Sequence, residues 1–547
     1  MNLSSNAFRR TAALLTGLWL LSTGPLRGET RCKNPSEQQL FIGEGIAEAA
    51  TQYGPVRGFL LRGVYSFRGI PYGDDTGGEN RFLPPRPPQP WHAVRPAVAY
   101  GASSPQPFYD RRPESYSMFV DHWNYDLMDE DCLRLNVWTP GLGDGKRRPV
   151  LVWLHGGGFT QGNGIEQDGY DGEHIARYGD IVFCSVNHRL GALGFTDLSA
   201  AGEKYRHSGN AGMLDLVAAL EWVQHNIAQF GGDPANVTIM GQSGGGSKVC
   251  LLCAMPAAEG LFHKAVALSG NSLRANDAEY ARRLGAAILD EAGLSAAEAD
   301  SLQTIPWERY LALADRARQR MAAANPGYRS GFAPVADGEV IPRGTFFKDE
   351  NRTVGSDVPM LLSSTFHEWN PDRDDPELEE ITLEEVVQRL APQYGPRAER
   401  IVAAYAAAFP ALRPIEIWAL IASNRQGVVQ TADAKCCQRS PVYMAWFGWQ
   451  SPLFNGRHRA FHCLDISFWL LNTDRMVTHT GGGREPRRLS RRMADALLHF
   501  MRTGDPNCGA LPRWPRYTPE RGETMIFDTR CRAAEDPDRT ARRAFHD

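Results

Sequence analysis

A serine between glycines follows an apolar run near the middle of this chain of 547 residues. Residues 241–245 read Gly-Gln-Ser-Gly-Gly, residues 237–240 before them are apolar or β-branched, and residues 247–252 after them favour a helix. Glycines two positions before and after Ser243 would permit a strained turn between a strand and a helix. The first N–H groups of that helix would face the serine oxygen, where negative charge develops during acyl transfer. The pattern therefore predicts Ser243 as a nucleophile.

A second apolar run also ends in glycines. Residues 149–154 read Pro-Val-Leu-Val-Trp-Leu and predict a buried strand, and residues 155–158 read His-Gly-Gly-Gly. Consecutive glycines let the backbone approach a substrate closely and direct N–H groups toward it. We expect the N–H groups of Gly157, Gly158 and Gly244 to form an oxyanion hole, which together with Ser243 indicates a serine hydrolase of the acyl-transfer type.

Several further segments resemble one family, the type B carboxylesterases or cholinesterase-like α/β-hydrolases. The resemblance extends from about residue 43 to the end of the chain, and the chain is similar to the secreted bacterial members of the family. The motifs that carry the resemblance are residues 67–72 (Phe-Arg-Gly-Ile-Pro-Tyr), 130–137 (Glu-Asp-Cys-Leu-Arg-Leu-Asn-Val), 187–195, 209–215 and 230–234. It implies an α/β fold of the α/β-hydrolase type. This fold has a large, mostly parallel twisted sheet with helices on both faces and helical cap insertions. It also implies one domain over residues 29–547 and a carboxylic-ester hydrolase that needs no cofactor and no metal.

The acidic triad member should follow a late strand, because this fold orders its triad as Ser, Asp or Glu, and His. Residues 358–365 predict such a strand, and Glu368 comes just after it. Asp337, which precedes a glycine, is the rival acid, although the resemblance implies a structural turn there. Trp369 stands where the family commonly has glycine, so its indole either narrows the substrate pocket or packs in the core.

The catalytic base is implied by residues 459–469, which resemble the histidine loop of the family and contain His462. His367 is the competing histidine, and His155 and His188 are interpreted as structural. The resemblance also implies that Ser269 braces the acid and that Arg189 and Asp215 form a buried ion pair.

The region of residues 271–438 is rich in alanine and predicts helices, with amphipathic candidates at residues 300–324 and 383–409. By resemblance, these insertions would cap the active site and line the substrate gorge. The chain has 59 Lys and Arg against 63 Asp and Glu, a formal net charge of −4, which indicates neither nucleic-acid binding nor a membrane-surface partner. Nothing in the sequence indicates an oligomeric state.

Arg9 and Arg10 precede an apolar run at residues 11–21 that is too short to span a bilayer, and small residues follow it. This pattern predicts a signal peptide over residues 1–28, with an ill-defined cleavage site, and a secreted or periplasmic protein without stable membrane insertion after its removal. A twin-arginine route and an uncut, membrane-anchored signal stay open.

The ten cysteines fit an oxidising compartment. Cys132 lacks the partner that cholinesterases have, so we expect it to be free or to pair elsewhere. Cys250 and Cys253 are interpreted as core thiols. The candidate bridge formers are Cys436, Cys437, Cys508 and Cys531.

Two functions compete for this sequence. The first is a secreted esterase in which Ser243, His462 and Glu368 hydrolyse small-molecule esters, including specialised ones such as a mycotoxin or xenobiotic, through an acyl-enzyme. The alternative is a catalytically inactive cholinesterase-like binding or adhesion domain. Such relatives lose the serine, the histidine or the glycine loop, and this chain keeps all three.

Overall fold

The computed structural model describes residues 38–107, 115–121, 123–124, 127–325 and 331–546. The predicted signal peptide at residues 1–28 lies outside the described residues. Within the described ranges, no helix is long and apolar enough to cross a membrane.

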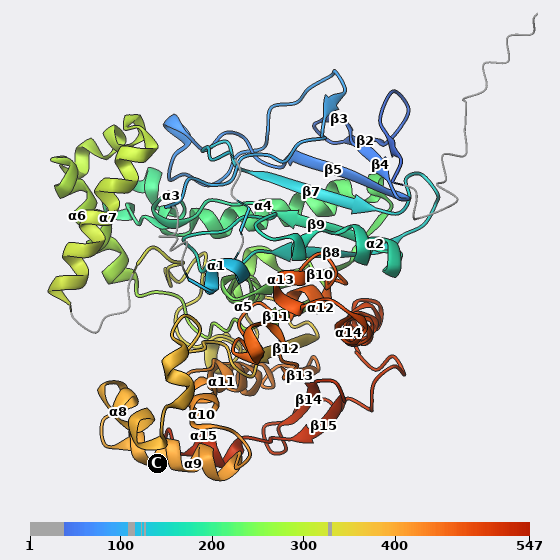
Figure 1. Ribbon diagram of the computed structural model, residues 1–547. Coiled ribbons are helices and arrows are strands. Elements are labelled where there is room, and N and C mark those ends of the chain that lie inside the picture. The colour runs from blue at the N-terminus through green and yellow to red at the C-terminus, as the bar shows by residue number, and fades with distance from the viewer. Residues whose placement is uncertain (1–37, 108–114, 122, 125–126, 326–330, 547) are drawn as a thin grey trace, which may run out of the picture.

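A large mixed sheet runs through the molecule (Figure 1). The strands from β9 to β14 pair in parallel, and the strands at both edges pair antiparallel. The spatial order of the twelve strands is β1 (Leu40–Phe41), β4 (Phe59–Leu61), β5 (Val64–Pro71), β7 (Arg134–Thr139), β9 (Val182–Val186), β8 (Arg148–Leu154), β10 (Gly232–Gln242), β11 (Lys264–Leu268), β12 (Met360–Thr365), β13 (Val442–Phe447), β14 (Glu523–Phe527) and β15 (Arg532–Glu535). A small second sheet contains β2 (Glu48–Thr51), β3 (Gly54–Arg57) and β6 (Arg95–Pro96). The mostly parallel sheet of the predicted α/β class is confirmed.

The helices that the structure describes lie on both faces of the sheet and at its periphery (Figure 1). In chain order they are α1 (Ser117–Val120), α2 (Glu173–Gly179), α3 (Gly191–Phe195), α4 (Ala211–Asn226), α5 (Gly244–Ala254), α6 (Ala278–Ala292), α7 (Trp307–Ala324), α8 (Leu383–Tyr394), α9 (Arg397–Ala408), α10 (Pro414–Ile421), α11 (Arg425–Lys435), α12 (Ile466–Trp469), α13 (Val477–Thr480), α14 (Arg484–Thr503) and α15 (Arg539–Arg543).

Strand β8 shows why the central strands are apolar throughout. Its side chains alternate between two cores: Val150 and Val152 pack with α4 and α5, whereas Leu151 and Trp153 pack with α2, α12 and α14. A parallel strand covered by helices on both faces buries both sets of side chains, so apolar residues occur in succession. The sheet and its two helical layers therefore form the rigid body that positions the loops at the strand ends.

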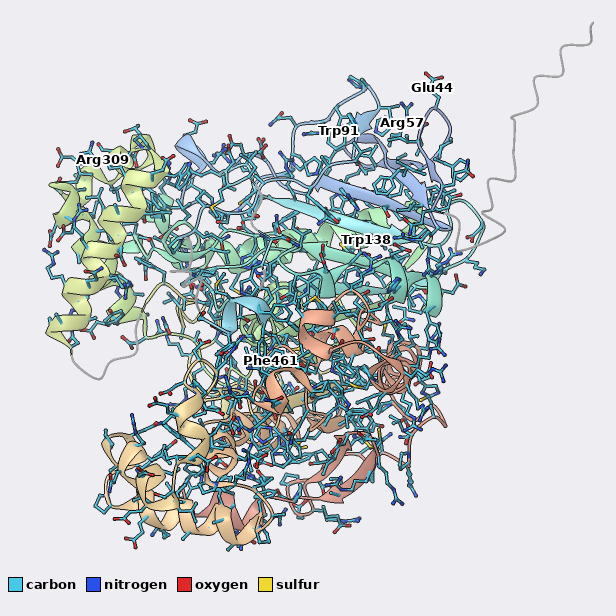
Figure 2. All side chains as sticks on the ribbon, in the orientation of Figure 1. Glu44, Arg57, Trp91, Trp138, Arg309 and Phe461 are labelled. Carbon is cyan, nitrogen blue, oxygen red and sulfur yellow. The ribbon has the colours of Figure 1, made fainter. Side chains whose placement is uncertain are left out.

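The insertion helices form where the sequence predicts them, but they do not line the site. Pro306 separates a 3₁₀ segment from α7, so residues 300–324 do not form one continuous helix. Helices α6 and α7 lie at one side of the molecule, and α8 and α9 lie at its lower end (Figure 1). Arg309 of α7 is at the periphery, far from Phe461, which lies in the interior (Figure 2). Helices α6 to α9 do not line the cavity reported below, but the same region of the chain does contribute to it, through Trp369, Arg373 and Asp374.

The cysteines that the structure describes are free thiols, including Cys132 as expected. The prediction that disulfide bridges involve Cys436, Cys437, Cys508 and Cys531 is therefore wrong. The Cys436 thiol donates to the Tyr517 carbonyl at 3.7 Å, and the Cys437 thiol donates to the Asp433 carbonyl at 3.9 Å. These two sulfurs take separate acceptors, and Cys531 Sγ lies 3.6 Å from the Asp528 carbonyl in its own chain segment.

The predicted buried ion pair is present. Arg189 Nη2 lies 2.6 Å from Asp215 Oδ1, and both side chains are inaccessible to solvent. The pair joins the loop after β9 to helix α4. Removing one partner would leave a buried charge uncompensated, which is costly.

Candidate active site

Ser243 lies at the tip of a sharp turn between β10 and α5. Its backbone has φ +57° and ψ −125°, a conformation that residues other than glycine rarely adopt. A Cβ on Gly241 would lie 2.4 Å from the carbonyl carbon of Gly245, and a Cβ on Gly245 would lie 2.0 Å from the Leu154 carbonyl oxygen. Both glycines are thus required by close backbone contacts, which explains the Gly-x-Ser-x-Gly spacing.

The glycine loop after β8 meets the start of α5. A Cβ on Gly244 would lie 2.1 Å from the Gly158 carbonyl oxygen, and Gly157 and Gly158 have φ +76° and +64°. Among the described residues, the N–H groups of Gly157 and Gly158 have no hydrogen-bond acceptor. Both glycines line the same cavity as Ser243. The structure therefore brings the three predicted oxyanion-hole glycines together, with unpaired donors in the loop.

Glu368 and His462 come from two loops and meet through their side chains. His462 Nδ1–H donates to Glu368 Oε2 at 2.5 Å, and the His462 N–H donates to the Glu368 carbonyl at 3.1 Å. The Thr365 N–H donates to Glu368 Oε1 at 2.9 Å, so this buried carboxylate is held on both oxygens. Burial lowers the pKa of His462, but Cys463 and Glu368 raise it, and the pKa lies well above its ordinary value.

The rival residues lie elsewhere. Asp337 Oδ1 accepts N–H groups of Glu339, Val340 and Ile341, which is the structural turn that the resemblance implies. His367 is buried outside the cavity, and burial lowers its pKa to about 3. His155 and His188 stack on each other at 5.2 Å inside the protein. None of these side chains lines the cavity that contains Ser243.

Ser269 does not have the role that the resemblance implies. Its hydroxyl is buried without a hydrogen-bond partner among the described residues, and Glu368 Oε1 is instead held by the Thr365 N–H. Ser269 has φ +47°, and its N–H donates to the Ser363 carbonyl at 2.7 Å. It braces the backbone beside the acid loop and not the carboxylate itself.

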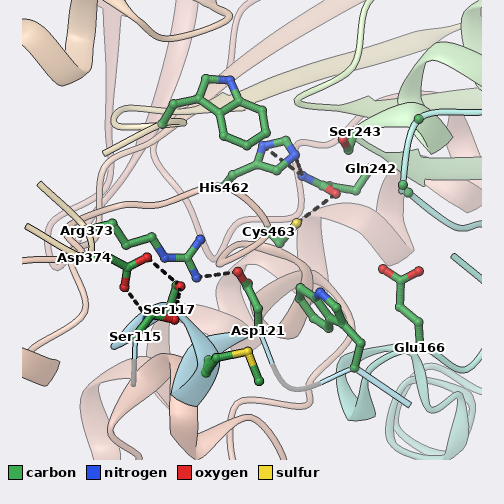
Figure 3. Close-up of a pocket in the computed structure, with 16 residues that line it drawn as sticks. Ser115, Ser117, Asp121, Glu166, Gln242, Ser243, Arg373, Asp374, His462 and Cys463 are labelled. Carbon is green, nitrogen blue, oxygen red and sulfur yellow. Dashed lines mark hydrogen bonds and ion pairs between the residues drawn. The ribbon is translucent and has the colours of Figure 1, made fainter. Parts of the chain in front are cut away.

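One cavity of about 540 Å³ contains these groups. Figure 3 shows Ser243 and His462 on one side of it and a set of charged residues on the other. The lining residues are Ser115, Ser117, Met118, Asp121, Trp123, Gly156, Gly157, Gly158, Glu166, Gln242, Ser243, Trp369, Arg373, Asp374, His462 and Cys463. In the described part of the chain, no group of His, Cys, Asp and Glu side chains could hold a metal ion.

Trp369 belongs to the cavity wall and not to the core. Its side chain is 55% exposed, and its ring centroid lies 4.3 Å from that of His462 at an angle of 30° between the planes. The indole thus stacks on the imidazole and faces the cavity. Of the two alternatives for this residue, the structure selects the pocket wall.

The family of the chain is evident from the known proteins that it resembles. The sequence pattern of the carboxylesterase family matches residues 47–388 and 422–545, which is most of the chain. The chain belongs to the carboxylesterase family. It is 35% identical to a para-nitrobenzyl esterase of Bacillus subtilis over 500 residues, covering 89% of this chain and 96% of the relative. It is 30% identical to a human cocaine esterase, covering 88% of each chain.

Solved structures of esterases resemble the structure of this chain. The structure of a Clostridium hathewayi esterase, described as able to hydrolyse aliphatic aromatic polyesters, superposes with a TM-score of 0.77 at 34% identity, covering 93% of this chain and 99% of that one. A Geobacillus stearothermophilus carboxylesterase gives a TM-score of 0.74 at 35% identity, covering 91% and 100%. The α/β-hydrolase fold and the carboxylic-ester hydrolase activity predicted from the sequence are confirmed.

The far wall of the carboxylesterase cavity is held together by polar contacts. Arg373 Nη2 lies 2.9 Å from Asp121 Oδ2, and Asp374 accepts the Ser117 N–H at 2.7 Å and the Ser117 hydroxyl at 2.6 Å. Burial raises the pKa of Glu166 to about 7. These contacts tie helix α1 to the loop that carries Glu368, so the acid loop also shapes the cavity mouth.

Sequence reasoning missed a lysine beneath the oxyanion loop of this carboxylesterase. Lys248 on α5 is inaccessible to solvent, and its Nζ donates to the His155 carbonyl at 2.9 Å. Burial lowers its pKa to about 7. A lysine within the apolar helix that follows the serine was the signal that could have revealed it, because lysine is almost never fully buried. No motif marks Asp121, Arg373 or Asp374, which become neighbours only through folding.

Proposed function

We propose that the carboxylesterase acts through Ser243, His462 and Glu368, with Gly157, Gly158 and Gly244 as the oxyanion hole. The observation that carries this assignment is the 2.5 Å bond from His462 Nδ1 to Glu368, next to the strained serine turn. With its Nδ1 proton held by Glu368, the imidazole presents Nε2 as the atom that accepts a proton. No described hydrogen bond joins Ser243 Oγ to His462, and such bonds tighten in the substrate complex in many enzymes.

In the proposed mechanism, Ser243 Oγ attacks the ester carbonyl carbon as His462 Nε2 takes its proton. The carbonyl oxygen becomes an oxyanion, which the three glycine N–H groups stabilise. The C–O bond to the alcohol then breaks, and the His462 proton passes to the leaving alcohol. Water attacks the acyl-enzyme with the same residues, releasing the carboxylic acid and free Ser243.

The proposed substrates are neutral small-molecule esters that carry an aromatic group. A cavity of about 540 Å³ falls within the range typical of small-molecule sites. Trp123 and Trp369 supply aromatic surface, and the carboxylates of the far wall disfavour acidic esters. The para-nitrobenzyl esterase among the relatives supports an aromatic ester as the first substrate to try.

The test uses purified protein, a panel of p-nitrophenyl and aryl esters, and a fluorophosphonate label. We expect hydrolysis and labelling by the wild type, and neither by Ser243→Ala. An unlabelled wild type would instead support the inactive binding domain.

We also propose export to the periplasm or medium. Support comes from Arg9 and Arg10 before the apolar run at residues 11–21. Cell fractionation, followed by determination of the mature N-terminus, tests this proposal. A cytoplasmic protein with residues 1–28 intact would refute it.

A further inference from the structure

The side chain of Gln242 contacts the ring of the proposed catalytic histidine. Gln242 precedes Ser243, is fully buried and lines the cavity. Its Nε2 lies 3.4 Å from His462 Nδ1 and 3.3 Å from His462 Nε2 (Figure 3). The near-equal distances place the amide nitrogen against the ring, off the in-plane lone-pair direction of Nε2 and close to both nitrogens, including the one that must accept the serine proton.

The thiol of Cys463 fixes which end of the Gln242 amide faces the ring. Cys463 Sγ–H donates to Gln242 Oε1 at 3.2 Å (Figure 3). A thiol proton needs an acceptor, so the amide oxygen faces Cys463 and the NH₂ group faces His462. Cys463 itself has φ +74°, a rare conformation for a residue other than glycine. The histidine loop thus adopts a strained turn that directs this thiol at the amide.

Partial positive charge beside an imidazole favours the neutral ring over the imidazolium. Glu368 holds the Nδ1 proton, and Gln242 Nε2 lies 3.3 Å from His462 Nε2, so the amide hydrogens place partial positive charge against the ring and disfavour the imidazolium. Glu368 acts in the opposite direction, since a carboxylate favours the imidazolium. The neutral amide therefore counteracts the carboxylate at the residue that must alternate between the two forms.

We propose that Gln242 is a positioning residue that holds His462 in its neutral, proton-accepting form, and that Cys463 fixes the orientation of Gln242. The inference rests on the proposed function, since it assumes that His462 is the base. The titratable and charged groups around His462 are Glu368, Cys463 and Asp465 on its own side, and Asp121, Glu166, Arg373 and Asp374 across the cavity.

The decisive variant is Gln242→Glu, which keeps the shape and adds a negative charge. An opposite charge within about 4–6 Å shifts a titration by about 1–3 pH units. We expect the acid limb of the kcat/KM profile for p-nitrophenyl acetate to move at least about one unit upward, with activity recovering by pH 9. Gln388→Glu, at an exposed position on α8, is the matched control and should leave the limb unchanged.

The cysteine is tested by a pair of substitutions. Cys463→Ala removes the donor to Gln242 and should lower kcat several-fold with less than a twofold change in KM. Cys463→Ser keeps a hydroxyl donor and should restore most of the loss. This rescue distinguishes a positioning role from simple packing, and melting temperatures show whether each variant folds.

An acid limb that stays at the wild-type position in a folded, active Gln242→Glu enzyme would overturn the proposal, as would Cys463→Ala kinetics equal to wild type. Activity lost at all pH values without recovery at pH 9 in a folded variant would also overturn it. Ser243→Ala is assayed in parallel. If that variant stays active, the proposed function fails, whereas an inactive Ser243→Ala beside an unmoved limb refutes only the role of Gln242.

Discussion

Replacing Trp369 with alanine should change substrate preference more than stability. The indole stacks on His462 with 4.3 Å between ring centroids, lines the cavity and is 55% exposed. A fully buried aromatic side chain covers roughly 150–250 Å², so somewhat less than half of that, about 90 Å², is buried here. At about 25 cal/mol per Å², its loss removes about 2 kcal/mol of unfolding free energy.

The effect of Trp369→Ala on substrate discrimination should be of similar size in free energy, and it should favour bulky esters. One apolar wall contact is worth roughly 1–3 kcal/mol of discrimination, which corresponds to a factor of about 5–150. We therefore expect kcat/KM for a bulky aryl ester, relative to p-nitrophenyl acetate, to rise about tenfold or more in Trp369→Ala. The melting temperature should fall by a few degrees, because in a chain of this size 1 kcal/mol shifts it by only about 2–4 °C or less.

The matched control for Trp369→Ala is Trp418→Ala, which removes a partly buried indole from α10 outside the cavity. It should lower the melting temperature by a similar amount and leave the ratio of the two esters unchanged. The reasoning is refuted if Trp369→Ala lowers the melting temperature strongly while scaling both esters down together. That result would mean that the indole acts as core packing.

Further outcomes follow from the proposed triad and from the buried lysine. Ser243→Ala should lose about 10⁴–10⁶ in kcat with an unchanged far-ultraviolet circular dichroism spectrum, and substantial residual turnover would mean that another group is the nucleophile. Glu368→Gln should lower kcat about 10⁴-fold through the wrong imidazole tautomer, whereas Asp337→Asn should lower it far less; equal losses in folded variants would contradict the assignment of the acid. The pKa of Lys248 falls from its ordinary 10.5 to about 7 on burial, so between these values the unfolded chain binds more protons and stability gains from rising pH. In urea unfolding at pH 7, 8 and 9, the free energy of unfolding of the wild type should rise relative to that of Lys248→Met by up to about 1.4 kcal/mol per pH unit. A difference that stays constant with pH would refute a neutral buried amine.

Contacts between neighbours in the chain were predictable. The serine turn depends on local backbone clearance, as between Gly241 and Gly245, whereas the clearances of Gly244 and Gly245 are to Gly158 and Leu154, which lie far away in the chain. Strands β8 and β10 and helix α5 also form where apolar runs and glycines predict them. Local sterics and burial leave these segments few other conformations, so the sequence alone specifies them.

The location of Glu368 and His462 in the chain was implied by resemblance, but their meeting required the sheet. They are held at the ends of two loops, and the position of each loop depends on the packing of β12 and α12. Ser269 shows how far a resemblance reaches: the resemblance implied a hydroxyl that braces the acid, but among the described residues that hydroxyl has no hydrogen-bond partner.

Only the tertiary structure decided the environment of the site. Whether Trp369 is core or wall, which thiol faces Gln242, and which carboxylates line the cavity all depend on residues distant in the chain. The same holds for the free cysteines and for the insertion helices that lie away from the cavity. A residue type limits the chemistry that a side chain can perform, but exposure and partners are set by its neighbours in space, and those neighbours are brought together only by the packing of the whole fold.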